Sequence, residues 1–173
     1  DAMLAVAQER TASGDAAGAE AVLRLAFGGG RRDAEILREL AALHRRQGRP
    51  DTALALACEA CALAPDDAAA HAVRGDLLWA CGELATAEAA YRRALAIRPD
   101  DDTLRFSLGR LMKAADQGSE AVAQLTAVLA HCPARPDVAL ELAGALHRMH
   151  RYDDALAALR HAQALEPGSP RVD

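Results

Sequence analysis

A 34-residue periodicity runs through this 173-residue chain. Alanine recurs at that interval in one series, which is Ala19, Ala53, Ala87, Ala121 and Ala155. Proline recurs at the same interval in a second series, which is Pro65, Pro99, Pro133 and Pro167. A fixed period of this length is typical of repeat proteins, in which each repeat packs mainly against its neighbours. The period therefore predicts an array of similar repeats.

Each period contains two amphipathic helical segments. In residues 68–101, apolar side chains recur at spacings of three, four and seven in two runs that Gly82 separates. That spacing places the apolar side chains on one face of each helix. Gly82 lies where a helix end requires a left-handed backbone, and Pro99 ends the second run because proline has no amide hydrogen. Each repeat is therefore predicted to be a helix–turn–helix.

Two further series of small residues follow the same period. They are Ala7, Ala41, Gly75, Gly109 and Ala143, and Ala26, Ala60, Ala94, Val128 and Ala162. Small residues at these three places, with a proline near the end of the repeat, resemble the tetratricopeptide repeat family. The small residues of the first helices are expected to form notches that let a second helix approach closely.

The resemblance implies an all-α, right-handed α-solenoid of five helix–turn–helix repeats. Residues 1–173 are expected to form a single repeat domain with repeats at 1–33, 34–67, 68–101, 102–135 and 136–169. Residues 170–173 are expected to begin a truncated following element. Three residues depart from the family pattern at places where a large apolar side chain is usual: His71, Arg74 and Arg105.

Composition and charge limit the classes of partner. The net charge of −5 and the pI near 5.7 argue against a general nucleic-acid binder, which needs clustered cations. No run approaches the roughly 18 apolar residues of a membrane-spanning helix, and the first residues do not form a signal peptide. The chain begins inside a helical pattern, so it is expected to be a segment of a longer protein. A cytoplasmic location is predicted.

The cysteines are the residues that most invite a chemical interpretation. Cys58 and Cys61 form a CxxC pattern on a predicted second helix, where packing is the favoured interpretation. Redox chemistry and metal binding remain alternatives, although zinc would need two more ligands. Unpaired thiols suit a reducing compartment. The acidic pairs at helix starts, such as Asp66 with Asp67, are interpreted as caps rather than catalytic acids.

In the resembled family, the first helix of each repeat lines a concave groove that binds peptides or partner helices. The matching positions assign this role to Arg38, Asp76, Trp79, Phe106, Arg110, Lys113, Leu140 and Glu141. Trp79 and Phe106 are predicted apolar anchors for a partner, the alternative being that both rings only shield the interior. Arg38, Arg110 and Lys113 are expected to pair with acidic groups of the partner. The residues of the family's carboxylate clamp are absent at the matching positions.

No catalytic residue, cofactor or metal site is predicted. The predicted function is a non-enzymatic protein–protein interaction module with a protein or peptide ligand. One alternative is the substrate-recognition arm of a larger bacterial enzyme, such as a glycosyltransferase, sulfotransferase or hydroxylase. A second alternative is a self-association scaffold that pairs end to end through the apolar face of the last helix, which consists of Ala155, Leu156, Leu159, Ala162 and Leu165.

Overall fold

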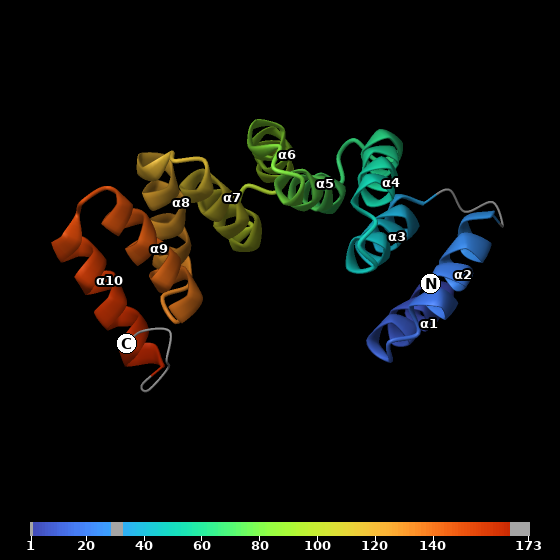
Figure 1. Ribbon diagram of the computed structural model, residues 1–173, viewed down its shortest axis with the longest axis horizontal. Coiled ribbons are helices and arrows are strands. Elements are labelled where there is room, and N and C mark those ends of the chain that lie inside the picture. The colour runs from blue at the N-terminus through green and yellow to red at the C-terminus, as the bar shows by residue number, and fades with distance from the viewer. Residues whose placement is uncertain (1, 29–32, 167–173) are drawn as a thin grey trace. The chain divides into compact units, whose positions relative to one another are not determined.

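The computed structural model describes residues 2–28 and 33–166, and within these ranges the only regular elements are α-helices (Figure 1). The helices form consecutive antiparallel pairs, which confirms the predicted all-α repeat fold. They are α1 (Ala2–Ala12), α2 (Ala16–Gly28), α3 (Ala34–Arg46), α4 (Pro50–Leu63), α5 (Ala68–Ala80), α6 (Leu84–Ile97), α7 (Asp102–Ala114), α8 (Gly118–His131), α9 (Pro136–Arg148) and α10 (Tyr152–Leu165). Pro167 and the predicted following element at 170–173 lie outside the described residues.

The chain divides into two compact units, Asp1–Ile97 and Arg98–Asp173. The N-terminal unit contains the pairs α1–α2, α3–α4 and α5–α6, and the C-terminal unit contains α7–α8 and α9–α10. Each first helix packs on its own second helix, and α2, α4 and α8 also pack on the first helix that follows them. The prediction of a single continuous domain stays a prediction.

Acidic side chains start several first helices. Asp33, Asp67 and Asp101 are the N-caps of α3, α5 and α7, and each carboxylate accepts a hydrogen bond from the backbone two residues ahead. Such a cap satisfies amide groups that have no partner inside the helix. Pro50 and Pro136 instead open α4 and α9, where the absent amide costs no helical hydrogen bond. The capping role predicted for the acidic pairs is confirmed at Asp67.

Glycine in the first helices permits close helix packing. A Cβ atom added to Gly75 would lie 3.0 Å from the ring of Tyr91, and one added to Gly109 would lie 2.9 Å from Leu125. Tyr91 and Leu125, on the second helices of the same pairs, are both fully buried. The notches predicted from the small-residue series are therefore occupied by the largest core side chains of α6 and α8.

The turn between the helices of each pair repeats one backbone conformation. Its residues have positive φ angles of 86° at Gly14, 72° at Gly48, 83° at Gly82, 63° at Asp116 and 59° at His150. The sequence predicts this conformation at Gly82, and the structure confirms it. In the C-terminal unit, an aspartate and a histidine adopt it instead, which costs these residues energy that glycine avoids.

Candidate functional site

The predicted groove residues divide between the two compact units. Arg38 on α3 and Asp76 and Trp79 on α5 belong to the N-terminal unit. The C-terminal unit holds the others, Phe106, Arg110 and Lys113 on α7 and Leu140 and Glu141 on α9. We call this second set the α7–α9 surface.

Glu141 links the two helices of the α7–α9 surface. Its Oε1 lies 3.2 Å from Nε of Arg110, and its Oε2 accepts a hydrogen bond from Nζ of Lys113. Two cations and one carboxylate leave one net positive charge on this cluster. The ion pairs are partly exposed, so solvent screens them and their contribution to stability is modest. Both cations remain near the surface but already have an internal partner.

Two guanidinium groups lie close to the ring of Phe106. The Cζ of Arg135 is 4.8 Å from the ring centroid and the Cζ of Arg110 is 5.7 Å from it. Both distances fall within the roughly 6 Å range of cation–π attraction. The ring is partly buried, so it supports the two arginine side chains as well as offering its own apolar area. Sequence reasoning missed Arg135, which belongs to the turn before α9 rather than to a first-helix face.

Asp137 holds Arg135 in place from the first turn of α9. The Arg135 Nε and Nη2 atoms donate to the two carboxylate oxygens at 3.1 and 2.5 Å. These bidentate hydrogen bonds lower the pKa of Asp137 and raise that of Arg135. The motif Arg135-Pro136-Asp137 therefore fixes a guanidinium at the N-terminus of α9.

Leu140 lines a pocket of about 340 Å³ in the same unit. Its other lining residues are Ala134, Arg135, Pro136, Asp137 and Glu166. Apolar atoms of Leu140 and Pro136 therefore lie beside a charged rim. A pocket of this size is large enough for one aliphatic side chain of a partner and is at the small end of ligand sites.

Arg148 on α9 contacts the C-terminal end of α7. Its Nη1 donates to the backbone oxygen of Lys113 at 2.5 Å, and its Nη2 donates to Asp116 at 2.6 Å. Arg148 thus satisfies a terminal carbonyl of α7, where the helix dipole also favours a cation. A pocket of about 210 Å³ adjoins these residues, lined by Lys113, Asp116, Gly118, Ala145, Arg148 and Met149. The two cationic side chains that line this pocket, Lys113 and Arg148, already donate hydrogen bonds to carbonyl and carboxylate groups of the chain.

In the N-terminal unit, Asp76 is held by residues of two other helices. It accepts a hydrogen bond from the hydroxyl of Tyr91, and its Oδ2 lies 3.6 Å from Nη1 of Arg45. Arg38 has its own partner, because its Nε lies 3.2 Å from Oδ2 of Asp67. Trp79 is partly buried on the same helix as Asp76, one turn further on. The predicted cation Arg38 is therefore engaged within the chain.

Consecutive first helices carry polar pairs separated by 31 residues. Gln8 donates to Glu39 at 3.1 Å over this separation. Arg45 with Asp76 and Arg110 with Glu141 have the same separation in two further pairs of neighbouring repeats. The separation equals one 34-residue period minus three positions, so it joins equivalent faces of neighbouring first helices.

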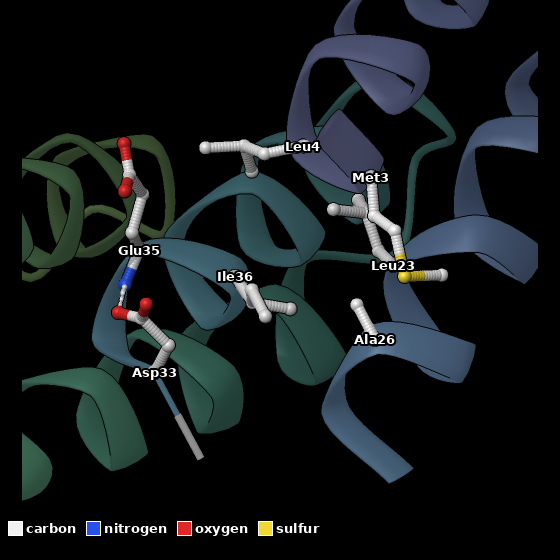
Figure 2. A pocket seen from close by; sticks show the side chains of 7 residues that line it. All are labelled: Met3, Leu4, Leu23, Ala26, Asp33, Glu35 and Ile36. Atoms are coloured by element: carbon white, nitrogen blue, oxygen red, sulfur yellow. Dashed lines mark hydrogen bonds between the residues drawn. The ribbon is translucent and has the colours of Figure 1, made fainter. Parts of the chain in front are cut away.

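Figure 2 shows a small gap where α1, α2 and α3 meet. Apolar side chains of Met3, Leu4, Leu23, Ala26 and Ile36 surround it, with Asp33 and Glu35 at one side. Its volume is about 10 Å³, close to the minimum that one water molecule requires. The gap is therefore an imperfection of core packing rather than a ligand site.

One cluster combines residue types used in catalysis. Nδ1 of His131 lies 3.1 Å from Asp102, and the thiol of Cys132 donates to the same carboxylate at 3.5 Å. That hydrogen bond raises the pKa of Cys132, whereas a thiol nucleophile requires a lowered pKa. Among residues 2–28 and 33–166, no group of three or more metal-ligating side chains could hold an ion. In the same residues, no helix is both long and apolar enough to cross a membrane.

The sequence matches two family descriptions that together cover the chain. Residues 1–113 match the tetratricopeptide repeat-like domain, and residues 114–173 match the tetratricopeptide repeat. No protein in the curated collection matches significantly.

Solved structures with the same fold share little sequence with this chain. PilF of Pseudomonas aeruginosa superposes with a TM-score of 0.88 at 20% identity, over 99% of this chain and 78% of its own. MamA gives 0.83 at 18% identity, over 93% of this chain and 94% of its own. YrrB, described as a TPR protein with an unusual peptide-binding site, gives 0.81 at 16% identity, over 98% and 88% of the two chains. The chain belongs to the tetratricopeptide repeat family, a family of protein–protein interaction modules.

Proposed function

We propose that this chain is a non-enzymatic interaction module whose α7–α9 surface binds a partner segment that presents an aliphatic side chain beside an acidic one. The observation that carries the proposal is the juxtaposition of Phe106 and Leu140 with a cluster of net positive charge. Family membership supports the protein-binding role, and the peptide-binding site for which YrrB is described supports a peptide as ligand.

The apolar contact would come from Phe106 and Leu140. The pocket beside Leu140 accommodates an aliphatic side chain, and the partly buried Phe106 ring offers apolar area at little cost in side-chain entropy. At protein interfaces, a few well-packed side chains near the centre provide most of the binding free energy.

The acidic group would bind to Arg110 and Lys113. Both already contact Glu141, so the partner carboxylate would share these cations with Glu141 rather than find them free. Such a shared arrangement limits the gain in affinity, and the one net positive charge of the Arg110, Lys113 and Glu141 cluster disfavours a basic group at that point, whereas Arg135 is already neutralised by Asp137.

The N-terminal unit offers a second contact surface of different character. Asp76 and Trp79 lie one helical turn apart on α5, and the carboxylate of Asp76 is oriented by Tyr91. The partner segment that meets this surface would present a polar or basic group to Asp76.

The test uses a fluorescein-labelled decapeptide with one leucine flanked by glutamates, measured by fluorescence anisotropy. We expect saturable binding in the micromolar range, about −8 kcal/mol, and at least about tenfold weaker binding when lysines replace the glutamates. Phe106→Ala should weaken binding by about tenfold or more, while Leu25→Ala, at a 68% exposed position on α2, should have no effect. Equal binding of the glutamate and lysine peptides would refute the proposed chemistry.

Self-association is a second candidate because apolar side chains are exposed on α1 and α10. Val6 is 41% exposed and Leu156 is 47% exposed. The predicted apolar face of α10 needs a correction: Ala155 and Ala162 are buried, because alanine lets α10 approach α9 closely.

Sedimentation from about 1 to 100 μM would test the pairing, since contacts of micromolar Kd populate over that range. Leu156→Lys should abolish any dimer, and a monomer at every concentration would exclude this candidate.

A further inference from the structure

Three apolar side chains form a row along the surface of α10. They are Tyr152, Leu156 and Leu159, at intervals of four and three residues, which is the spacing by which one helix packs against another. Tyr152 is 56% exposed and Leu156 is 47% exposed, while Leu159 is partly buried. Helix α10 packs on α9 through a neighbouring side, which holds the buried Ala155 and Ala162 (Figure 1). We call the three side chains the α10 row.

Two histidines hold the ring of Tyr152 in place. Nδ1 of His150 lies 2.7 Å from the Tyr152 hydroxyl, and the ring of His147 contacts the tyrosine ring edge-on at a centroid distance of 5.4 Å. An aromatic side chain that is exposed and already fixed gives a large apolar contact at little cost in side-chain entropy. Tyr152 is therefore suited to anchor a partner.

The same face of α4 receives a helix. Leu54 and Ala57 stand three periods before Leu156 and Leu159. Both belong to an apolar cluster that includes Leu77 of α5. The α10 row therefore has the position and the chemistry of a surface that a helix covers.

Opposite charges flank the α10 row on one side. Asp153 and Arg160 follow Tyr152 and Leu159 by one residue each, so they lie on the same flank of the helix, and both are exposed. Neither has a hydrogen-bond or ion-pair partner among residues 2–28 and 33–166. The equivalent pairs in the other second helices lack this combination of charges: Ala17 and Arg24, Asp51 and Cys58, Ala85 and Arg92, and Ser119 and Thr126.

This arrangement is complementary to itself about a two-fold axis. If two copies of α10 lie antiparallel with the axis at Leu156, each Leu156 meets its own counterpart and Tyr152 lies opposite the partner's Leu159. Antiparallel helices bring the same flank of each copy together, so Asp153 faces the partner's Arg160, to within one residue, and the reverse pair forms by symmetry. One contact therefore gains an apolar centre and two ion pairs.

Helix α1 of a second copy is less suited to cover the α10 row. Glu9 occupies the position at which the other first helices have Leu43, Leu77, Leu111 and Ala145, all of them buried. In the α4–α5 contact, Leu77 is the residue that packs against Ala57. The same contact between α10 and α1 would bury the carboxylate of Glu9 against apolar side chains, which is costly.

We propose that two copies of this chain pair through α10, antiparallel about a two-fold axis, with the α10 row at the centre and Asp153 bound to the partner's Arg160 on each side. The inference rests on the self-association candidate above and specifies its interface. A two-fold contact closes on itself, so it produces a dimer and nothing larger. Because each copy contributes a single helix face, we expect a weak dimer with a Kd on the order of 10–100 μM.

The experiment is sedimentation of charge variants from about 1 to 300 μM, a range that brackets this Kd. Asp153→Arg makes the flank wholly positive and Arg160→Asp makes it wholly negative, so each variant alone should dimerise about tenfold more weakly than the parent. An equimolar mixture of the two variants should recover the parent's affinity, because opposite charges then meet across the interface. The matched control is Asp51→Arg, the same change at the equivalent exposed position of α4, which should dimerise as the parent does.

The possible outcomes separate this interface from the other proposals. A dimer that is insensitive to both charge variants, or a mixture no tighter than either variant alone, would place self-association on another surface and overturn the α10 pairing only. Species that grow beyond a dimer would indicate the open-ended contact of α10 with α1. A monomer at every concentration would overturn the pairing together with the self-association candidate. Peptide binding by the α7–α9 surface is measured separately by anisotropy, so none of these results decides it.

Discussion

The hydroxyl of Tyr91 donates a hydrogen bond to the carboxylate of Asp76. Tyr91 is fully buried on α6 and its ring fills the notch at Gly75, whereas Asp76 lies on the first-helix surface of α5. A core side chain thus orients a surface carboxylate, so packing inside the α5–α6 pair determines the geometry of its outer face.

Tyr91→Phe should separate the packing role of this side chain from its polar role. The ring would still fill the notch at Gly75, but Asp76 would lose a donor, so we expect about 1 kcal/mol less stability toward urea. The m-value should be unchanged because the buried area is the same. An unchanged midpoint would mean that water replaces the hydroxyl at no cost.

Two glycines on first helices of the C-terminal unit should respond oppositely to alanine. At Gly109 a Cβ atom would lie 2.9 Å from the buried Leu125, whereas at Gly144 the nearest atom is the flexible Lys113 Nζ at 3.5 Å. Overpacking costs roughly 1–3 kcal/mol, while alanine gains about 1 kcal/mol of helix propensity over glycine.

Gly109→Ala should therefore lower the thermal midpoint and Gly144→Ala should raise it. Calorimetry of both variants at one protein concentration provides the comparison, and each variant is the control for the other. If both midpoints rise, α8 can move away from α7 without loss of packing.

His150→Gly should stabilise the turn between α9 and α10. His150 has a φ of 59°, a left-handed conformation that costs a non-glycine residue about 1–2 kcal/mol. Part of this gain is offset, since the exposed His150 ring is 2.7 Å from the Tyr152 hydroxyl and glycine is freer when unfolded. We expect a net gain of a few tenths to about 1 kcal/mol by chemical denaturation.

The reverse change at the equivalent turn of the N-terminal unit provides the control. Gly82→Ala places a side chain at a φ of 83°, so it should destabilise the chain by about 1 kcal/mol. Stabilisation by Gly82→Ala would show that the turn relaxes to an ordinary conformation.

The period of the sequence was sufficient to predict the helix pairs and the notches at Gly75 and Gly109, because these depend on residue size and spacing alone. It was insufficient for Asp116 and His150, since neither residue type requires a left-handed conformation. In those turns the surrounding helices impose a conformation that the local sequence does not favour.

The sequence predicts which helix faces carry the residues of the candidate site, but it does not predict which of these residues pair with one another. The positions of Arg110 and Glu141 follow from the repeat register, yet their ion pair depends on how neighbouring first helices align. A search for opposite charges separated by 31 residues would have found it, and it would also have found Arg45 with Asp76. Arg135 could not be found in this way, because it contacts Phe106 from a turn outside the helical register.

Acid should remove the contribution of the Arg135–Asp137 pair to stability. Hydrogen bonds from Arg135 lower the pKa of Asp137 in the folded chain. A depressed carboxyl pKa contributes stability that is present above the unfolded value near 3.9 and is lost as pH falls through the folded value. Because both groups are partly exposed, the contribution is at most about 1 kcal/mol.

The difference in unfolding free energy between the parent chain and Asp137→Asn should therefore be constant from about pH 5 to 7 and shrink below about pH 4. Asp153→Asn, at an exposed position in the first turn of α10, is the control for loss of one carboxylate near a helix N-terminus. A difference that grows on acidification would contradict the assignment.

Glu141→Gln should slightly lower the stability of the chain and raise its affinity for acidic partners. In the parent chain, Glu141 accepts both Arg110 and Lys113, so a partner carboxylate competes with it. Glutamine has nearly the same shape but no charge, which raises the net charge of the cluster from one to two. Loss of the exposed ion pairs should cost less than about 1 kcal/mol of stability, while the affinity for the glutamate-flanked leucine peptide should rise several-fold. The gain should diminish in high salt, because the screening length falls to about 3 Å at 1 M. Weaker binding to this peptide would instead mean that Glu141 itself contacts the partner, and the α7–α9 surface would then favour a basic segment.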